Sequence, residues 1–366
     1  MNFLQLCKYN LKSFGGIEYV TKVIHNELKY CHKIFSVSFL RSKDQKILSD
    51  EIACNINLTF FNQPISLKYI KFVYKSIRKV DCIIYHHPNP VSLILLVLRI
   101  KHIKNLIVFW HSDIINFGIL GKIIYFFEKF LIKKSNIVIF TSKEYYENSY
   151  ISHCLLQKQV KIIPIGLDTP KEKASMTFQK KDYLNIVFIG RLIEYKGILQ
   201  MLGSLSKVNI SIRLSIIGSG YLRKKIDEKI SNLASNIKVK VLENISDDSK
   251  YRLLSKANFL ILPSLSKAEA FGIVLIESLS VGTPIITHYV KGSGMNEVNS
   301  QTDGAIVGYV YGKQLDTDLP TLINKIYKLS INEYESLKKN ARLKYLKKYT
   351  LAKFKQNLRK IILDAN

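Results

Sequence analysis

Acidic residues are scarce in this sequence, which has 28 Asp and Glu against 55 Lys and Arg and a formal net charge of +27 at pH 7. This imbalance predicts attraction to an anionic partner, whether nucleic acid, a phospholipid surface or a phosphorylated small molecule. Cysteine is also sparse. The five cysteines are odd in number, lack a C-x-x-C spacing and all lie in the first half. They are typical of reduced thiols and argue against a disulfide framework or a zinc site.

Long hydrophobic runs are missing as well. The most apolar run, VSLILLVLRI, meets Arg99 and Lys101 well before the roughly 20 apolar residues that a membrane span needs. The beginning, MNFLQLCKYNLK, lacks the charged start and apolar core of a signal peptide. We therefore expect a cytoplasmic protein, soluble or peripheral on the inner face of the cell membrane.

The chain has no internal repeat and no low-complexity tract, and its 366 residues, 47% of them hydrophobic, suffice for two cores. Short apolar runs alternate with helical patterns almost throughout, which predicts an α/β protein with two doubly wound parallel sheets. The predicted strands are FLQLC, IFSVSFL, LTFF, DCIIYH, NLIVFWH, NIVIFTS and VKIIPIG, then LNIVFIG, IRLSIIG, IKVKVL, NFLILPS and TPIITH. We place the domains at residues 1–165 and 166–345, followed by a basic C-terminal helix at 346–366.

Two helical patterns in the first domain combine lysines with an apolar stripe. In SLKYIKFVYKSIRKV the apolar residues are Ile70, Val73, Tyr74 and Ile77, and in GILGKIIYFFEKFLIKKSN they are Ile123, Phe126, Phe127 and Phe130. One interpretation is a solvated helix packed on a sheet by that stripe. The other is an amphipathic surface drawn to anionic lipid, which the net charge favours.

Three segments place glycines or polar side chains at predicted strand ends, where ligands of open α/β sheets bind. FGGIEYV puts Gly16 between a strand and a helix, so that a phosphate can approach backbone N–H groups, although a tight turn explains it equally well. GRLIEYKG follows a strand and contains Gly190, Arg191 and Lys196. The two cations, Arg191 and Lys196, either neutralise a diphosphate or are surface charges. WHSDI ends a strand with His111, which faces a sugar or is a satisfied core histidine.

The stretch EAFGIVLIE sets Glu269 and Glu277 around an apolar helix start. An unpaired buried carboxylate is costly, so both acids point to water or hold a ligand. Glu269 precedes the predicted helix, Gly282 ends it, and the first N–H groups of the helix have no partner within it. Two carboxylates beside a row of N–H donors suit a sugar nucleotide.

This constellation resembles the family 4 (group 1) retaining glycosyltransferases, which have the GT-B fold of two Rossmann-like domains facing a central cleft. The resemblance rests on EAFGIVLIE with SVGTPII, on GRLIEYKG, on the FGGIE turn and on HSD. It implies that Glu277 holds the ribose and Glu269 the donor sugar, with the backbone of Phe271, Gly272, Ile273 and Val274 facing sugar and phosphates. Arg191 and Lys196, after Gly190, balance the diphosphate, Gly16 closes over it, and His111 lies near the reacting sugar.

As implied by this resemblance, the chain transfers a sugar from a nucleotide diphosphate donor to a lipid-linked oligosaccharide, as in O-antigen, lipopolysaccharide or capsule biosynthesis. We expect retention, no metal and no other cofactor, a basic C-terminal helix packing back towards the first domain, and an anionic membrane surface as a partner. Two rivals remain: a basic nucleic-acid-binding protein, for which no reading module is found, and a GT-B phosphorylase. The pair Asp316 and Asp318 is interpreted as a helix cap and not as a metal site.

Overall fold

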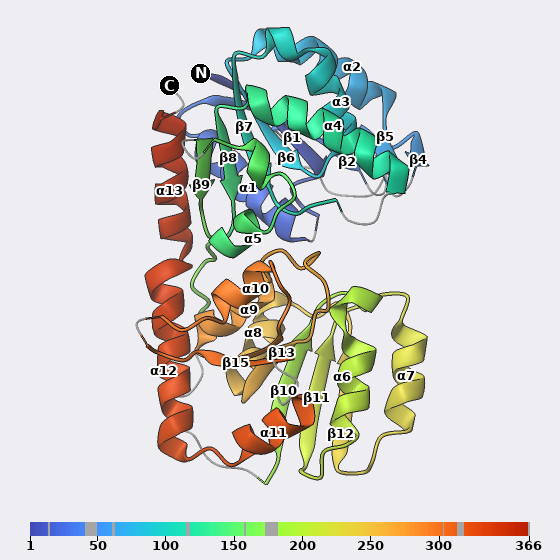
Figure 1. Ribbon diagram of the computed structural model, residues 1–366, viewed down its shortest axis with the longest axis vertical. Coiled ribbons are helices and arrows are strands. Elements are labelled where there is room, and N and C mark those ends of the chain that lie inside the picture. Colours follow the sequence, from blue (N-terminus) through green and yellow to red (C-terminus); the bar gives the residue numbers. More distant parts are fainter. Residues whose placement is uncertain are drawn as a thin grey trace. The chain divides into compact units, whose positions relative to one another are not determined.

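The computed structural model describes residues 1–13, 15–40, 50–60, 63–114, 118–156, 159–172, 182–302, 304–312 and 318–364. The chain divides into two compact units (Figure 1). Unit 1 consists of Met1–Ile165 with Phe354–Asn366, and unit 2 of Gly166–Lys353. No helix in the part of the chain that is described is both long and apolar enough to cross a membrane.

Unit 1 is built on a seven-stranded, all-parallel sheet in the order β3-β2-β1-β6-β7-β8-β9. Its strands are β1 (Asn2–Tyr9), β2 (Lys33–Leu40), β3 (Glu51–Asn55), β6 (Cys82–His87), β7 (Asn105–Trp110), β8 (Ile137–Phe140) and β9 (Val160–Ile162). The central strands β6 and β8 are buried at every residue, as expected for a parallel sheet covered on both faces.

Two predictions for the strands of unit 1 need correction. The run LTFF forms β4 (Leu58–Phe60), which pairs antiparallel with β5 (Gln63–Ile65) in a separate hairpin and not in the parallel sheet. The edge strand β3, EIACN, was missed because it carries Glu51, Ala53 and Asn55, residues of low strand propensity. It joins the sheet by pairing with β2.

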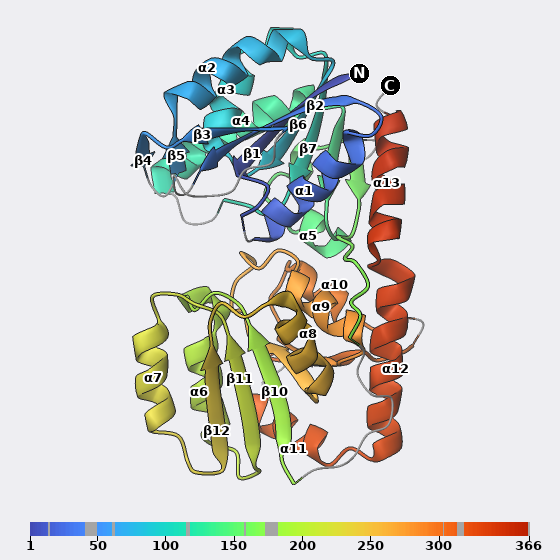
Figure 2. The ribbon, with the colours of Figure 1, turned by 180° about the vertical axis from the view of Figure 1, so that it is seen from behind.

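Helices cover both faces of this sheet. They are α1 (Gly16–Leu28), α2 (Leu67–Ser76), α3 (Pro90–Leu98), α4 (Gly118–Lys134) and the short α5 (Lys143–Glu147). The helices α2, α3 and α4 lie together on one face, and α1 lies on the other, in front of the sheet in Figure 2. Ser66 and Asn89 start α2 and α3 by accepting from backbone N–H groups inside the first turn.

The apolar stripes of α2 and α4 differ from expectation. In α2 the buried residues are Tyr69 and Val73, and the predicted core residue Tyr74 is 43% exposed. In α4 the buried residues are Glu128, Leu131 and Ile132, whereas Phe126 is 66% exposed. The hypothesis that the stripe of α4 packs on the sheet is therefore wrong, because this helix turns that stripe to solvent.

Unit 2 has a six-stranded parallel sheet in the order β12-β11-β10-β13-β14-β15. Its strands are β10 (Leu184–Ile189), β11 (Ile212–Ile217), β12 (Ile237–Leu242), β13 (Phe259–Leu262), β14 (Ile285–His288) and β15 (Gly308–Tyr311). The order reverses between β10 and β13, which makes their carboxyl ends the switch point where ligands of such sheets bind. The short edge strand β15, GYVY, was not predicted.

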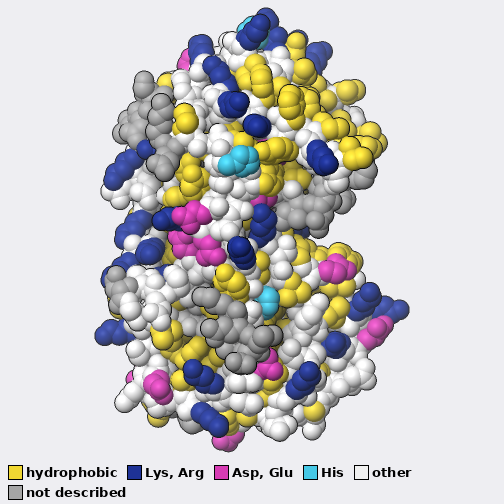
Figure 3. Space-filling view, viewed as in Figure 1, with side chains coloured by type: hydrophobic (Ala, Val, Ile, Leu, Met, Phe, Trp, Pro, Cys, Tyr) yellow, Lys and Arg dark blue, Asp and Glu magenta, His cyan; other side chains and the backbone are white. Residues whose placement is uncertain are grey.

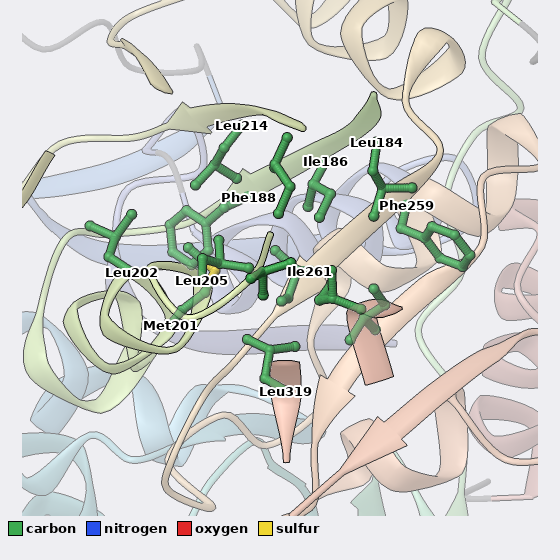
Figure 4. Packing of buried hydrophobic residues seen from close by; sticks show 14 of the residues in the cluster. Leu184, Ile186, Phe188, Met201, Leu202, Leu205, Leu214, Phe259, Ile261 and Leu319 are labelled. Carbon is green, nitrogen blue, oxygen red and sulfur yellow. The ribbon is translucent and has the colours of Figure 1, made fainter. Parts of the chain in front are cut away.

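The helices of unit 2 form two groups, and within each group neighbouring helices are in contact. One contains α6 (Ile198–Leu205), α7 (Arg223–Ser231) and α11 (Leu319–Tyr327), and the other α8 (Asp247–Lys256), α9 (Ile273–Val281) and α12 (Ile331–Lys348). A shorter helix, α10 (Gly294–Val298), contacts α9. Figure 4 shows Ile186 and Phe188 of β10 packing with Met201, Leu202 and Leu205 of α6 in the buried core. This core holds β10 in place, and β10 in turn positions the residues that follow it.

The basic C-terminal pattern forms two helices, α12 and α13 (Leu351–Asp364). Within unit 1, Glu27 of α1 is paired with Arg359 and with Lys355, at 3.2 Å, of α13. Elsewhere, Asp318 caps α11 by accepting from the N–H of Thr321 at 2.8 Å, as predicted. Its partner in the prediction, Asp316, lies outside the described residues.

Candidate functional site

The switch point of unit 2 brings two of the predicted residues into contact. Lys196 follows β10, and Glu269 follows β13, the strand paired with β10. The Lys196 ammonium donates to Oε2 of Glu269, and Ser264 also donates to this oxygen, at 3.3 Å. The two side chains are only 9% and 13% exposed, so this ion pair is largely shielded from water.

The free oxygen of Glu269 matters for binding. Both donors use Oε2, and no described residue donates to Oε1. An ionised carboxylate is an acceptor only and takes several hydrogen bonds. Glu269 is therefore fixed by one oxygen, and its other oxygen remains as an acceptor.

One glycine makes room for this arrangement. Gly190 packs beside the aliphatic part of Lys196, where a Cβ would lie in ordinary van der Waals contact, 3.5 Å from Cε and 3.6 Å from Cδ. Gly197 has a φ of 69°, and a Cβ at this position would lie 2.1 Å from the carbonyl oxygen of Pro263. The segment after β10 thus approaches the backbone after β13 as only glycine allows.

The start of α9 presents backbone donors beside Glu269. Gly272 adopts a φ of 76° and precedes the helix, and Gly282 ends it with a φ of 85°, as predicted. Within the described part of the chain, the N–H groups of Gly272, Ile273 and Val274 have no acceptor. The side chain of Phe271 is buried and contacts the ring of Tyr349 edge-on, so this residue contributes only its backbone. Free N–H groups at a helix start favour an anion.

Glu277 lies further along α9 and is held by a lysine that the sequence did not single out. Lys250 of α8 donates to Glu277 Oε1 at 2.7 Å and to Asp247 at 2.8 Å. Burial raises the pKa of Glu277, partly offset by Lys250. Burial acts to lower the pKa of Lys250, but Glu277 and Asp247 outweigh it and raise that pKa. We assign this contact as an ion pair, because Lys250 Nζ and Glu277 Oε1 lie 2.7 Å apart and both side chains are largely buried.

Arg191 differs from Lys196, although both follow β10. It is exposed, and its guanidinium donates to the hydroxyl of Tyr195 at 3.2 Å. Nothing described holds it as Lys196 is held. It is therefore a cation at the strand end that is free to move towards a ligand.

The remaining predicted residues, His111 and Gly16, belong to unit 1. Gly16 is the first residue of α1 and follows Gly15, which accepts from the N–H of Tyr19. His111 directly follows β7 and is buried, with Nε2 2.9 Å from Nδ1 of His86. Burial, together with the nearby His87, lowers the pKa of His111 to about 3, so this imidazole is neutral at physiological pH.

Asp113, the acid of the HSD motif, has a structural role. Asp113 accepts from Trp110 Nε1 at 2.9 Å and from the hydroxyl of Ser149 at 2.5 Å. Its backbone N–H donates to the hydroxyl of Tyr145 at 2.6 Å. Asp113 thereby fixes the chain after β7, which positions His111.

Sequence reasoning missed Lys250, Ser264 and His86. Ser264 follows β13 in ILPSLS, and its place at a strand end was the available signal. His86 lies in the buried strand β6, next to His87, and the presence of two adjacent histidines at the end of this strand was the available signal. Lys250 had no such signal, since α8 meets Glu277 only through tertiary packing.

Comparison with known proteins agrees with this geometry. Residues 169–344 match the family described as Glycosyl transferases group 1. A D-rhamnosyltransferase of Pseudomonas aeruginosa is 25% identical over 258 residues, which cover 69% of this chain and 66% of that protein, just under two thirds of its length. The O-antigen chain mannosyltransferase C of Escherichia coli is 24% identical over 316 residues, 82% of each chain.

Solved structures resemble the chain over its full length. Anabaena HepE in complex with UDP and glucose has a TM-score of 0.74 at 14% identity and covers 99% of both chains. The apo form of the lipopolysaccharide outer core galactosyltransferase WaaB has a TM-score of 0.69 at 16% identity and covers 100% of both. These likenesses concern the fold. Residues 169–344, which lie in unit 2, thus match the Glycosyl transferases group 1 family, and the chain as a whole has the GT-B fold.

Proposed function

We propose that this protein transfers a sugar from a nucleotide-diphosphate-sugar to a lipid-linked oligosaccharide, with retention of the anomeric configuration and without a metal. The observation that carries the proposal is the Lys196–Glu269 pair at the switch point of unit 2, with one oxygen of Glu269 left for a ligand. The family match and the activities of the two relatives support it.

The donor is assigned to unit 2 by chemistry. Glu277, with one oxygen held by Lys250, has its second oxygen for the paired hydroxyls of a ribose. Glu269 accepts from hydroxyls of the donor sugar. The N–H groups at the start of α9, with Lys196 and Arg191, face the diphosphate. HepE has been solved with UDP and with UDP-glucose, which supports a nucleotide donor of this type.

The reaction breaks the bond between the anomeric carbon and the leaving phosphate oxygen, and the bonding electrons go to that oxygen. The acceptor hydroxyl forms the new bond on the same face, and its proton passes to the departing phosphate. Negative charge therefore grows on the diphosphate, where Lys196, Arg191 and the α9 N–H groups stabilise it by electrostatic preorganisation.

A membrane-bound acceptor is supported by an apolar patch on unit 1. Figure 3 shows apolar side chains gathered over the region of α4, with lysines and arginines among them. We define the patch by six exposed residues of α3 and α4, which are Ile94, Leu98, Ile119, Ile123, Phe126 and Phe130. The lysines of α4 that accompany it, all exposed, are Lys122, Lys129, Lys133 and Lys134.

The energies favour reversible binding to an anionic bilayer. Burial of each half-exposed apolar side chain contributes about 1–2 kcal/mol, and each lysine near an anionic surface about 1 kcal/mol. The patch therefore suits a peripheral enzyme at the cytoplasmic face of the membrane. The Escherichia coli relative is an O-antigen chain mannosyltransferase, which supports a place for this protein in the synthesis of a surface polysaccharide.

A donor screen followed by product analysis tests the proposal. UDP-, GDP- and dTDP-sugars are compared for thermal stabilisation, because a bound donor stabilises by mass action. The matching donor is then incubated with lipid-linked acceptors, and NMR determines the anomeric configuration of the product. We expect retention, activity unchanged by EDTA, and a loss of at least a hundredfold in Glu269→Gln but not in Glu243→Gln, an exposed acid in unit 2.

Three results would contradict the proposal. Inversion at the anomeric carbon would overturn the front-face reaction. Wild-type activity of Glu269→Gln would overturn the site assignment. Cleavage of a glycan that requires free phosphate and no nucleotide would identify a phosphorylase instead.

A further inference from the structure

A group of basic side chains lies together where α2 and α3 of unit 1 end. Arg99 follows α3, with Lys101 and His102 after it, and Arg78 lies just after α2. The two helices are in contact, as Figure 1 shows. Arg78 donates through Nη2 to His102 Nε2 at 3.1 Å. We call these four residues the α3-end cluster.

The surrounding sequence offers this cluster almost no negative charge. Between Glu51 and Asp113 the only acid is Asp81. Its side chain already accepts from Lys104 at 3.0 Å and from the backbone N–H of Asn2 at 2.9 Å. Among the described residues, no carboxylate pairs with any member of the cluster. The α3-end cluster therefore has an uncompensated positive charge.

Arg99 is the buried member of the cluster. It is only 9% exposed, and its Cζ lies 4.1 Å from the centroid of the Tyr74 ring, whose hydroxyl accepts from Nη1 at 3.3 Å. Its Nε is fully buried and has no acceptor. Buried charges are normally paired, because taking an unpaired ion out of water is costly. An anion beside Arg99 would offset this cost.

Both guanidinium groups have N–H donors left for such an anion. Nη2 of Arg99 makes no hydrogen bond and is not among the fully buried polar atoms, so it reaches the surface. Arg78 is exposed, and because arginine can only donate, His102 accepts through an unprotonated Nε2 and orients it. Loss of hydration and the charges of the other three members lower the pKa of His102, so these cations act on one place.

The chemistry and the position of the cluster indicate a phospholipid. Guanidinium N–H groups match the oxygens of a phosphate, with which arginine forms paired, charge-assisted hydrogen bonds. Leu98, which directly precedes Arg99, and Ile94 belong to the apolar patch and are 68% and 46% exposed. An apolar surface that continues into a cationic cluster suits a lipid, because the headgroup phosphate lies next to the hydrocarbon region.

We propose that Arg78, Arg99 and Lys101 bind the headgroup phosphate of an anionic phospholipid at the edge of the apolar patch. His102 is a positioning residue that orients Arg78. The site lies wholly within unit 1. It rests on the membrane part of the proposed function and adds to it a defined site for one phosphate, beyond the general attraction of lysines to an anionic surface.

Flotation of the full-length protein with phosphatidylcholine vesicles that contain phosphatidylglycerol tests the site. Arg78→Lys/Arg99→Lys keeps the net charge but replaces both planar guanidinium groups, so we expect vesicle binding to weaken about tenfold. The matched control is Arg213→Lys, which changes an exposed arginine of unit 2 whose Cζ lies 3.7 Å from the ring centroid of Tyr183. This control should stay within twofold of the wild type.

General attraction depends on charge alone and predicts no loss in the double variant. Unchanged vesicle binding of Arg78→Lys/Arg99→Lys would therefore overturn the site and leave the apolar patch in place. If this variant does not fold, Arg78→Lys decides, because it changes only an exposed side chain. We then expect a loss of about threefold, and no loss would overturn the site.

Calorimetry with inorganic phosphate and with glycerol phosphate, without vesicles, tests a soluble source of the phosphate. We expect no binding of either at millimolar concentration. Binding that is lost in Arg78→Lys/Arg99→Lys would overturn the assignment to a lipid. A wild-type protein that bound no anionic vesicle would contradict both this site and the membrane part of the proposed function. Sugar transfer is measured separately, so its absence would contradict the proposed activity and not the site.

Discussion

Lys250 Nζ lies 2.7 Å from Glu277 Oε1, which ties the start of α8 to the middle of α9. The lysine and the acid are 16% and 13% exposed, whereas Asp247, the second partner of Lys250, is 80% exposed. Lys250 therefore orients Glu277, the carboxylate proposed to hold the ribose. Asp247, which is exposed, contributes little to the position of Lys250.

Lys250→Met should weaken nucleotide binding while changing kcat less. Without the lysine, Glu277 is left partly buried and unpaired, so its carboxylate takes up a proton more readily and accepts fewer hydrogen bonds. We expect about a tenfold rise in the Kd of the nucleotide, measured by calorimetry. Asp247→Asn is the matched control and should stay within twofold. Equal effects of the two variants would contradict the role given to Lys250.

Lys196 and Glu269 should behave as one unit in a double-mutant cycle. Lys196→Met and Glu269→Gln each remove one partner of the same contact, and each is expected to lower kcat at least a hundredfold. Because residues that act together are not additive, the double variant should be about as slow as the slower single variant. The measurement is the initial rate with saturating donor. Losses that simply multiply would show that the two residues act independently.

Gly197→Ala should be more harmful than Gly304→Ala. Both glycines have a positive φ, 69° and 76°, which costs about 1–2 kcal/mol for alanine. At Gly304 a Cβ meets nothing within 4 Å, whereas at Gly197 it would clash with the backbone of Pro263. Denaturant unfolding should therefore show a larger loss for Gly197→Ala, by a further 1 kcal/mol or more, and donor binding should weaken only in that variant. Equal losses in stability would mean that the close approach after β10 is not required.

Removing the two phenylalanines of the apolar patch should abolish membrane binding. Phe126→Gln/Phe130→Gln deletes the largest apolar side chains of α4 that face solvent, and a helix tolerates glutamine well. In a flotation assay with anionic vesicles, we expect at least a tenfold loss of bound protein. The control is Leu343→Gln/Leu346→Gln, which changes two residues of α12 that are each 42% exposed. Binding unchanged by the first pair would remove the patch from the proposal.

The stability of unit 2 should rise with pH above neutrality because of Lys344. Burial, with a smaller effect from Lys348, lowers the pKa of Lys344 to about 7, and its ammonium donates to the carbonyl oxygens of Glu297 and Ser300. The unfolded chain keeps the usual pKa near 10.4, so it binds more protons than the folded chain between about pH 7 and pH 10. The free energy of unfolding then increases with pH by at most about 1.4 kcal/mol per unit.

Denaturant unfolding at pH 7 and pH 9.5 measures this effect. Lys344→Met lacks the titrating group, so its stability should change less over the same interval, whereas Lys353→Met, an exposed lysine, should follow the wild type. The same slope in wild type and Lys344→Met would contradict the assignment.

Several features of the fold were predictable because they depend on local patterns. The strands that precede Gly190 and Ser264 follow from residue type and spacing alone. The same is true of Gly282, the αL glycine at the end of α9, and of the Asp318 cap. Asn244 has a φ of 53°, in the left-handed region that asparagine visits more readily than most residues. The edge strand β3 escaped because its residues have weak strand propensity. The edge strand β15, GYVY, escaped because it has only four residues, and its pairing with β14 determines it.

The sequence by itself determined two parallel α/β units, a resemblance to the group 1 glycosyltransferases and the residues at the strand ends, since periodicity and motif spacing depend only on the order of residues. Only the tertiary structure decided how those residues are used. It paired Lys196 with Glu269 because β10 and β13 are neighbours at the switch point, although 73 residues separate the two side chains. It placed Lys250 on Glu277 and His86 on His111, and it turned the stripe of α4 to solvent. Contacts between distant segments depend on packing, which a linear pattern does not contain.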